Sequence, residues 1–384
     1  MIAYNKTLLE NTFLISEAID LKKSNFIQEA DLTKIKADLE PLKTSRNIFV
    51  RFGFLLLGSF MFSSIIGFIS VIALNNLNTE YKAIGFVFAT VGIVVLELLA
   101  SQNFFRHGLD DAFLIATQMS FYISVFIATE SQIAVAIAMI IMGLICCIRY
   151  ISTLSFLVFL SGIVFLVGVL LINHTTISSA LPFVLLAIAI GFYNIHQKII
   201  NNEQLYFYHN VLDWFFIFSL FLGYLAINYY VVRTLSEELL NADYSKSDVP
   251  FGWIFNLLMF LLPIVYVFYA LKTKNRAMLY IGALTFVLSV ATFRYYHNIM
   301  PAEWALILAG GLIFGAVYFV IQKIKEKSTG ITFLPDRTTN TAMLNTVEAL
   351  IVNSQNMHHA QTTQDSDMPF GGGGFSGGGA SEGF

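Results

Sequence analysis

The feature that most constrains the fold is a nearly unbroken apolar block over residues 50–321, interrupted only by short polar links. The whole chain is 57% hydrophobic and 12% charged, whereas a soluble domain carries nearer a quarter charged residues. A helix needs about twenty apolar residues to cross a bilayer, and its backbone groups must all be paired there. The block therefore predicts an all-α fold, a polytopic transmembrane helix bundle.

The apolar block divides at its polar links into about ten expected spans. They cover residues 50–74, 83–100, 112–128, 133–148, 153–172, 177–193, 211–232, 251–271, 277–293 and 302–321. The least distinct boundary runs from Arg149 to Ser152. Without it, the fourth and fifth spans would fuse into one helix of about forty residues, or about 60 Å, which is too long for one crossing.

The positions of the Lys and Arg residues predict the orientation. Short cytosolic loops carry an excess of these residues. With ten spans and both termini in the cytosol, 18 of the 22 Lys and Arg residues lie on the cytosolic side. Fusing the fourth and fifth spans would leave Arg149 in lipid. We therefore expect cytosolic N and C termini.

The chain outside the apolar block divides into a head and a tail. Residues 1–48 predict a cytosolic helical head with two short helices, over 7–23 and 28–39. The bundle of residues 49–322 follows. Two interpretations of the head stay open: a small cap on the bundle, or a hairpin that docks a protein partner. This head, followed by many spans, resembles uncharacterised multi-pass bacterial membrane families known only as domains of unknown function. The resemblance implies a place in the bacterial cytoplasmic (inner) membrane and no activity.

The tail begins with a basic linker and a short helix over residues 323–353, and residues 354–384 are expected to be disordered. Its last fifteen residues are FGGGGFSGGGASEGF, a flexible Gly-rich sequence with spaced Phe residues that a partner could capture. It resembles the Gly-rich tails that end bacterial TPM-domain membrane proteins. Those commonly end in a Ser-Gly-x-Trp-like sequence, which Ser381 to Phe384 replaces here. The resemblance implies a shared handling or assembly route and carries over no catalytic residue.

Ionisable residues inside the block are costly in a membrane and are therefore functional candidates. Most of them fall near the expected cytosolic ends of the spans. They are Glu97, Arg106, Asp110, Asp111, Arg149, His196, His209 and Asp213. One interpretation is structural, with Glu97 paired to Arg106 and the two aspartates capping the third span. The other is that all eight converge into a polar cavity open to the cytosol, which binds an ion, a proton or a polar head group.

Three further features inside or between the spans carry simpler expectations. Gln118 is a strongly polar amide near mid-membrane, and we expect it to make an interhelical hydrogen bond. Pro263 lies within the eighth span and predicts a kink. Residues 233–250 form the longest link between spans and are expected to be a solvated outer loop with at most one helical turn.

Motifs for catalysis, metal or nucleic acid are not found in the sequence. It contains no nucleophile elbow, Walker A loop or H-E-x-x-H motif. Cys146 and Cys147 are adjacent in an apolar run, which suits neither a disulfide framework nor a zinc site. His209 and Asp213 are too few for a metal site. No basic stretch interleaved with aromatics indicates nucleic acid binding, and we expect no cofactor.

Three functions remain open from the sequence. The first is a non-enzymatic interaction or envelope-maintenance component, which sits in the lipid bilayer and offers its head or Gly-rich tail to a protein partner. The alternative is a small-molecule or ion transporter, because ten spans divide into a 5+5 inverted repeat of the kind common in transporters. The third is a membrane enzyme that acts on lipid, with the inner-leaflet carboxylates as acid and base.

Overall fold

The computed structural model describes residues 2–24, 26–76, 81–172, 180–200, 202–240, 252–296 and single positions between 304 and 325. The elements in these ranges are helices, and nine of them are long and apolar enough to cross a membrane. This confirms the all-α, multi-pass class. The expected tenth span over 302–321 lies largely outside the described residues, and the expected short helix and Gly-rich tail lie wholly outside them.

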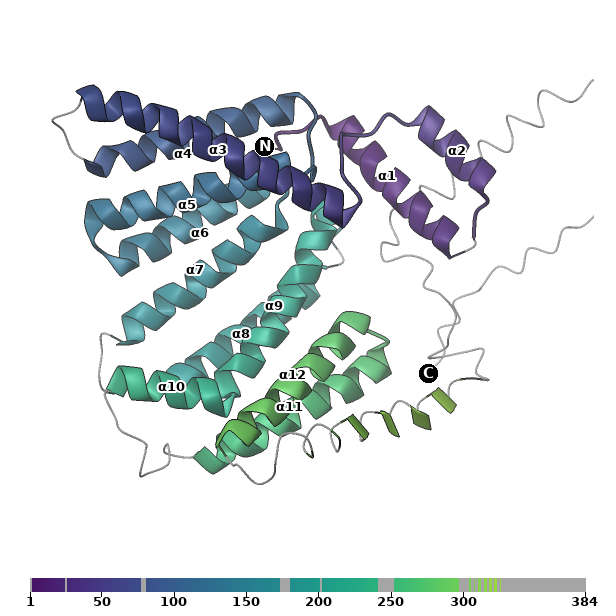
Figure 1. Cartoon of the computed structure of the whole chain (residues 1–384). Helices are drawn as coiled ribbons and strands as arrows, with labels where there is room; N and C mark the ends of the chain where they lie inside the picture. Colours follow the sequence, from purple (N-terminus) through teal and green to yellow (C-terminus); the bar gives the residue numbers. More distant parts are fainter. Residues whose placement is uncertain are drawn as a thin grey trace, which may run out of the picture.

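The nine long helices follow the predicted spans closely (Figure 1). They are α3 Ile48–Asn76, α4 Tyr81–Ser101, α5 Leu109–Thr129, α6 Gln132–Tyr150, α7 Thr153–Ile172, α8 Leu181–Ile199, α9 His209–Ile227, α11 Gly252–Thr273 and α12 Arg276–Tyr296. The boundary after Arg149 is a sharp turn, because Ile151 adopts a left-handed conformation with φ 52° and ψ 41°. A β-branched residue rarely adopts this conformation, and complete burial of Ile151 holds it there. The fourth and fifth spans are therefore separate helices.

The head contains the two predicted helices, α1 Lys6–Lys23 and α2 Glu29–Asp38. Asn5 caps α1 by accepting hydrogen bonds from the backbone N–H groups of Thr7 and Leu8, at 2.9 and 3.4 Å. The apolar side of α2 packs against α1 in a small core. Its buried members are Leu14, Ile15, Ala18, Leu21, Leu32 and Ile35. The head is thus a helical hairpin with its own apolar contacts.

The expected solvated loop after the seventh span is wrong over its first part. The span ends at Ile227, and a further helix, α10 Tyr229–Leu240, begins two residues later. Asn228 separates the two helices, because its Oδ1 accepts hydrogen bonds from the N–H groups of Tyr230 and Val231, at 3.0 and 3.3 Å. The buried Tyr229 and Val232 then pack α10 against α11. An asparagine cap and one apolar face therefore replace the first part of the loop with a helix that packs on α11.

The helices pack most closely as sequential hairpins, namely α4–α5, α6–α7, α8–α9 and α11–α12. Glycines permit the close approach in the second pair, since a Cβ on Gly143 would lie 2.8 Å from the Phe159 nitrogen of α7. Counted as spans, these pairs are 2–3, 4–5, 6–7 and 8–9. A five-plus-five repeat would carry the close pairing of α4 with α5 over to α9 and α11, and those two pack much less closely. The pairing pattern therefore does not repeat after five spans.

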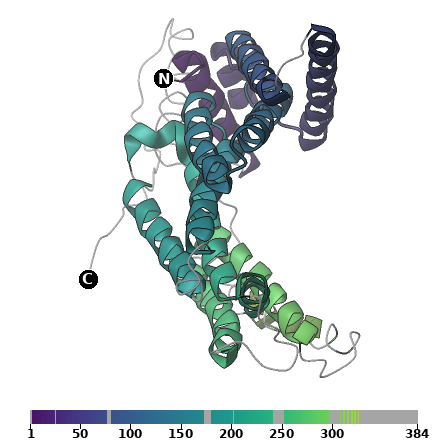
Figure 2. The same cartoon turned by 90° about the vertical axis from the view of Figure 1, so that its left-hand side faces the viewer.

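The head lies against one end of the bundle, which we call the head side (Figures 1 and 2). The N–H of Ala3 donates to the carbonyl of Arg149 at the end of α6, at 2.9 Å. The linker after α2 pairs with the α4–α5 link, where the Lys43 N–H donates to the Asn103 carbonyl at 2.8 Å and the Phe105 N–H donates to the Lys43 carbonyl at 3.1 Å. Backbone hydrogen bonds thus fix the head at both of its ends.

Candidate functional site

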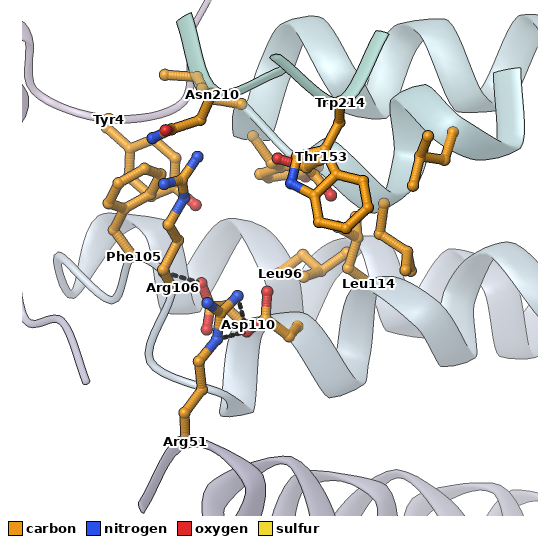
Figure 3. Close-up of a pocket in the computed structure, with 16 residues that line it drawn as sticks. Tyr4, Arg51, Leu96, Phe105, Arg106, Asp110, Leu114, Thr153, Asn210 and Trp214 are labelled. Atoms are coloured by element: carbon orange, nitrogen blue, oxygen red, sulfur yellow. Dashed lines mark hydrogen bonds and ion pairs between the residues drawn. The ribbon is translucent and has the colours of Figure 1, made fainter. Parts of the chain in front are cut away.

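A cavity of about 430 Å³ lies at the head side of the bundle (Figure 3). Its walls come from the ends of several long helices and from the N-terminal segment of the head. They are formed by Tyr4, Arg51, Leu96, Phe105, Arg106, Asp110, Asp111, Leu114, Tyr150, Ile151, Ser152, Thr153, Leu154, Leu157, Asn210 and Trp214. Segments far apart in the sequence meet here, which makes this head-side cavity the best candidate for a functional site.

Arg51 and Asp111 form an ion pair at one edge of the cavity. The Nε and Nη2 atoms of Arg51 lie 2.7 and 2.6 Å from Oδ2 of Asp111. The pair connects the first turn of α3 to the first turn of α5. The two helices approach closely below it, because Gly58 of α3 lies against the Cβ of Ala112 and the backbone of Leu109. The positive charge of Arg51 therefore compensates the negative charge of the Asp111 carboxylate within the cavity wall.

Asp110 organises the link that enters α5. Its carboxylate accepts hydrogen bonds from three successive backbone N–H groups, those of Arg106, His107 and Gly108, at 2.6, 2.9 and 3.0 Å. Gly108 has φ 112°, and a Cβ there would collide with the Arg51 carbonyl oxygen. Neither aspartate caps α5 as expected: Asp110 holds the link before the helix, the N-cap residue Gly108 makes no side-chain cap hydrogen bond, and Asp111 pairs with Arg51.

The Arg106 side chain extends from this link toward the head. Its guanidinium lies over the Phe105 ring, 5.2 Å from the ring centre. Figure 3 places it beside Tyr4 and Asn210. Its Nη2 atom is buried and has no hydrogen-bond partner among the described residues. Burial, and then the nearby charge of Arg51, lower the pKa of Arg106. The guanidinium stays cationic in proteins. Arg51, Arg106, Asp110 and Asp111 all line the cavity and balance in charge, so what Arg106 lacks is a hydrogen-bond acceptor for its buried Nη2.

Glu97 and Arg149 pair beside the cavity and correct one expectation. The guanidinium of Arg149 donates from Nε to Oε1 at 2.5 Å and from Nη2 to Oε2 at 2.6 Å, and the Tyr150 hydroxyl donates to Oε1 at 2.6 Å. The expected pairing of Glu97 with Arg106 is wrong. The ends of α4 and α6 bring Arg149 within reach, while Arg106 points toward the head. Tyr150 also lines the cavity, so this pair supports its wall.

Five of the eight candidates lie outside the cavity lining: Glu97 and Arg149 stand beside it, and the other three lie elsewhere. His196 on α8 is buried against Phe215 and Phe216 of α9, with ring centres 6.1 and 5.0 Å away. His209 and Asp213 share a face of α9, and the cavity is lined by their neighbours Asn210 and Trp214 instead. The structure thus places Arg106, Asp110 and Asp111 in the cavity, Glu97 and Arg149 beside it, and these three elsewhere.

Gln118 makes the interhelical hydrogen bond that the sequence predicts. Its Nε2 donates to the Ser155 hydroxyl at 2.6 Å, which connects α5 to α7. Gln118 is 2% exposed, so this bond satisfies a polar group that would otherwise be costly in the membrane. Within the described ranges, no group of three or more His, Cys, Asp or Glu side chains could hold a metal ion.

Sequence reasoning missed several residues that shape the cavity. Arg51 stands in the sequence only as one more charge close to the head. Nothing in the pattern around Tyr4 indicates that it reaches the bundle, where its ring packs 5.0 Å from that of Phe105. The sequence did indicate a special place for Trp214, because a tryptophan near the end of a span is typical of a membrane interface. No sequence pattern indicated that Asn210 lines a cavity.

The cavity has two unlike ends (Figure 3). Arg106, Tyr4 and Asn210 gather at one end, while Leu96, Leu114 and Trp214 lie toward the other. This arrangement suits binding of a group with one polar and one apolar part. Comparison with known proteins finds no family model, curated protein or solved structure that matches the chain. The resemblances of the head and of the Gly-rich tail therefore stay predictions.

Proposed function

We propose that this chain is a non-enzymatic component of the bacterial cytoplasmic membrane that acts through protein interaction or in envelope maintenance. Both termini lie in the cytosol, and the head, together with the Gly-rich tail, engages a protein partner. The observation that carries the proposal is the attachment of the head to the bundle. Backbone hydrogen bonds join Ala3 to Arg149 and Lys43 to the α4–α5 link.

Side-chain packing supports a fixed head. The α1 helix is buried on two sides: Leu14 and Ala18 pack against α2, and Leu9 belongs to the core of the bundle. Phe13 bridges the head to two links, with its ring 6.2 Å from Phe105 and 5.9 Å from Phe207. A partner that binds the outer side of α2 would meet a surface that is already ordered, which lowers the entropic cost of binding.

The carboxylates of the head side support a binding role over a catalytic one. Glu97 and Asp111 accept hydrogen bonds from arginine side chains, and Asp110 accepts three from the backbone. A general base must be free to take a proton from a substrate. These acids are instead held by cationic or backbone donors, which suits walls that keep their shape.

The orientation is tested by thiol labelling from outside the cell. Cys146 and Cys147 are buried and are replaced by Ala. Single cysteines are then introduced by Lys36→Cys on the exposed side of α2 and Thr129→Cys at the opposite end of α5. The proposal predicts that a membrane-impermeant maleimide labels the second variant in intact cells and the first only after permeabilisation. A reporter fused after Lys327 that proved periplasmic would overturn the orientation.

The partner role is tested by photocrosslinking in growing cells. A benzophenone amino acid is placed at Lys36 or Ala37 on the outer side of α2, and at Thr129 as the matched control on the other membrane side. The proposal predicts one discrete adduct of the same mass from both head positions and none of that mass from the control. Equal adduct patterns from all three positions, or no adduct from the head, would contradict it.

A further inference from the structure

Arg106 carries a buried guanidinium nitrogen, Nη2, that has no hydrogen-bond partner among the described residues. The two carboxylates nearest to it are already engaged, Asp110 by three backbone N–H groups and Asp111 by Arg51. Neither carboxylate accepts a hydrogen bond from the buried Nη2 of Arg106, which makes none in the part of the chain that the structure describes. A buried charge of this kind is stable only with a counter-charge and hydrogen bonds. The group that completes this site is therefore a hydrogen-bond acceptor for Nη2, and an anionic oxygen is the acceptor that a guanidinium binds most strongly.

The surroundings of Arg106 favour phosphate as that anion. A guanidinium presents a planar fork of N–H donors that matches phosphate oxygens. Asn210 and Tyr4 lie with Arg106 at the polar end and add amide and hydroxyl donors, and Thr153 adds a hydroxyl nearer Trp214. A phosphate ester has several oxygens to fill such a donor set.

The apolar end of the cavity indicates the kind of chemical group to which the phosphate is attached. Leu96, Leu114 and Trp214 lie toward this end (Figure 3). Leu154 and Leu157 also line the cavity, and Leu154 and Trp214 are its outward-facing apolar side chains, at 46% and 47% exposed. These two side chains lie near the starts of α7 and α9, at the ends of membrane-spanning helices. Phospholipid headgroups occupy this depth, and tryptophan favours it. The ligand therefore carries apolar chains that leave the cavity toward the bilayer.

We propose that the head-side cavity binds a glycerophospholipid of the adjacent leaflet, with its phosphate on Arg106 and its acyl chains leaving past Leu154 and Trp214. Tyr4 belongs to the head, and Asn210 and Thr153 belong to the bundle. The bound phosphate thus contacts both and holds the head in place. This inference does not rest on the partner role proposed above, and it is tested on purified protein without any partner.

The test uses Trp214 as a reporter in the cavity lining. The chain has three tryptophans, and the other two, Trp253 and Trp304, are exposed and are replaced by Phe. The protein in detergent micelles is titrated with phosphatidylglycerol that carries brominated acyl chains, which quench tryptophan fluorescence on contact. Brominated diacylglycerol, which has the same chains and no phosphate, is titrated in parallel. Quenching is expected to saturate at a concentration about tenfold lower for the phospholipid, as the loss of one charge-assisted contact implies.

Substitutions test whether the preference for the phospholipid over diacylglycerol depends on Arg106. Arg106→Gln is expected to remove the tenfold preference, and Arg106→Lys to retain part of it, because lysine keeps the charge without the fork. Arg46→Gln is the matched control, since Arg46 is an exposed head arginine that pairs with Asp20 at 2.8 Å and does not line the cavity. It is expected to leave the preference unchanged. If Arg106→Gln does not fold, Asn210→Ala at the same polar end takes its place and is expected to reduce the preference.

Three outcomes would overturn the proposal. The first is equal quenching by the two brominated lipids. The second is a preference that survives in folded Arg106→Gln. The third is displacement of the brominated phospholipid by millimolar glycerol 3-phosphate, which would assign the phosphate site to a soluble ester instead of a lipid. A preference for the phospholipid that depends on Arg106 and resists glycerol 3-phosphate supports it.

Discussion

Arg149 donates hydrogen bonds to both carboxylate oxygens of Glu97, from Nε at 2.5 Å and from Nη2 at 2.6 Å. The two residues belong to α6 and α4, so the pair fastens two hairpins of the bundle at the head side. The carbonyl of Arg149 also accepts the hydrogen bond from Ala3. One residue therefore connects α4, α6 and the head, directly behind the cavity wall formed by Tyr150.

Removing the Glu97 carboxylate should destabilise the bundle measurably. Glu97→Gln leaves Arg149 and the Tyr150 hydroxyl with a weaker acceptor, and we expect a loss of about 1–3 kcal/mol, seen as a lower unfolding temperature in detergent. The double variant Glu97→Gln/Arg149→Gln should cost less than the sum of the single changes. Asp20→Asn, which breaks the exposed pair with Arg46, should stay within about 0.5 kcal/mol. Equal losses for Glu97→Gln and Asp20→Asn would contradict this role.

The close packing of α6 on α7 predicts that adding a side chain at Gly143 destabilises the bundle. A Cβ on Gly143 would lie 2.8 Å from the Phe159 nitrogen and 2.9 Å from the Ser155 carbonyl oxygen. Gly143→Ala should therefore force the helices apart and lower the unfolding free energy by about 1–3 kcal/mol. A Cβ on Gly168 of α7 would meet no atom within 4 Å, and Gly168→Ala should be neutral or stabilising by about 0.5–1 kcal/mol. The same loss at both glycines would refute a contact between the helix backbones here.

Glu17 in the head predicts a pH-dependent stability. It is 7% exposed, and burial, followed by the charge of Asp20, raises the pKa of its carboxyl from 4.5 to about 7. The folded head therefore prefers the protonated carboxyl. The stability that this preference contributes is fully present below pH 4.5 and is lost as the pH rises through about 7.

Glu17→Gln should consequently be more stable than the parent chain at pH 8, by about 1–2 kcal/mol, and equal to it near pH 4.5. Thermal unfolding at both pH values measures this difference. Glu29→Gln is the control with the opposite sign, because the hydrogen bond from Lys22 lowers the pKa of the exposed Glu29. It should not stabilise the chain at pH 8. A Glu17→Gln effect that is independent of pH would show that the carboxyl is not protonated in the fold.

The sequence predicted those parts of the fold that periodicity and hydropathy determine. The long spans and the helices α1 and α2 lie where their apolar patterns place them, because burial of a helix face is a local property of the sequence. The α10 helix was not predicted, because its polar residues are typical of a loop. The cap by Asn228 and the contact with α11 stabilise it as a helix. Asn228 caps α10 by accepting hydrogen bonds from backbone N–H groups, and amino-acid composition does not reveal such contacts.

The candidate site was predictable only in part, for a related physical reason. Charges at the ends of apolar helices drew attention to Asp110, Asp111 and Arg106, because such charges are costly in a membrane. The partners of these charges depend on which helix ends are neighbours. Glu97 pairs with Arg149, which is 52 residues away, and not with the nearer Arg106. The contribution of Tyr4 likewise depends on how the head docks, which no local pattern determines.

The most direct test of the whole account asks whether the head is docked in native membranes. Lys43 and Phe104 face each other in a parallel bridge between the head linker and the α4–α5 link. Neighbouring strands in such bridges lie about 4.8 Å apart, a spacing that suits the Cα separation of about 4.4–6.8 Å in disulfides. Lys43→Cys/Phe104→Cys is made with Cys146 and Cys147 replaced by Ala, beside the control pair Lys36→Cys/Phe104→Cys, whose first position lies on the exposed side of α2. Mild oxidation of isolated membranes is followed by thiol counting. The account predicts that most molecules of the first pair form a disulfide and few of the control pair do. Equal, low disulfide yields for both pairs would contradict a head that is fixed to the bundle.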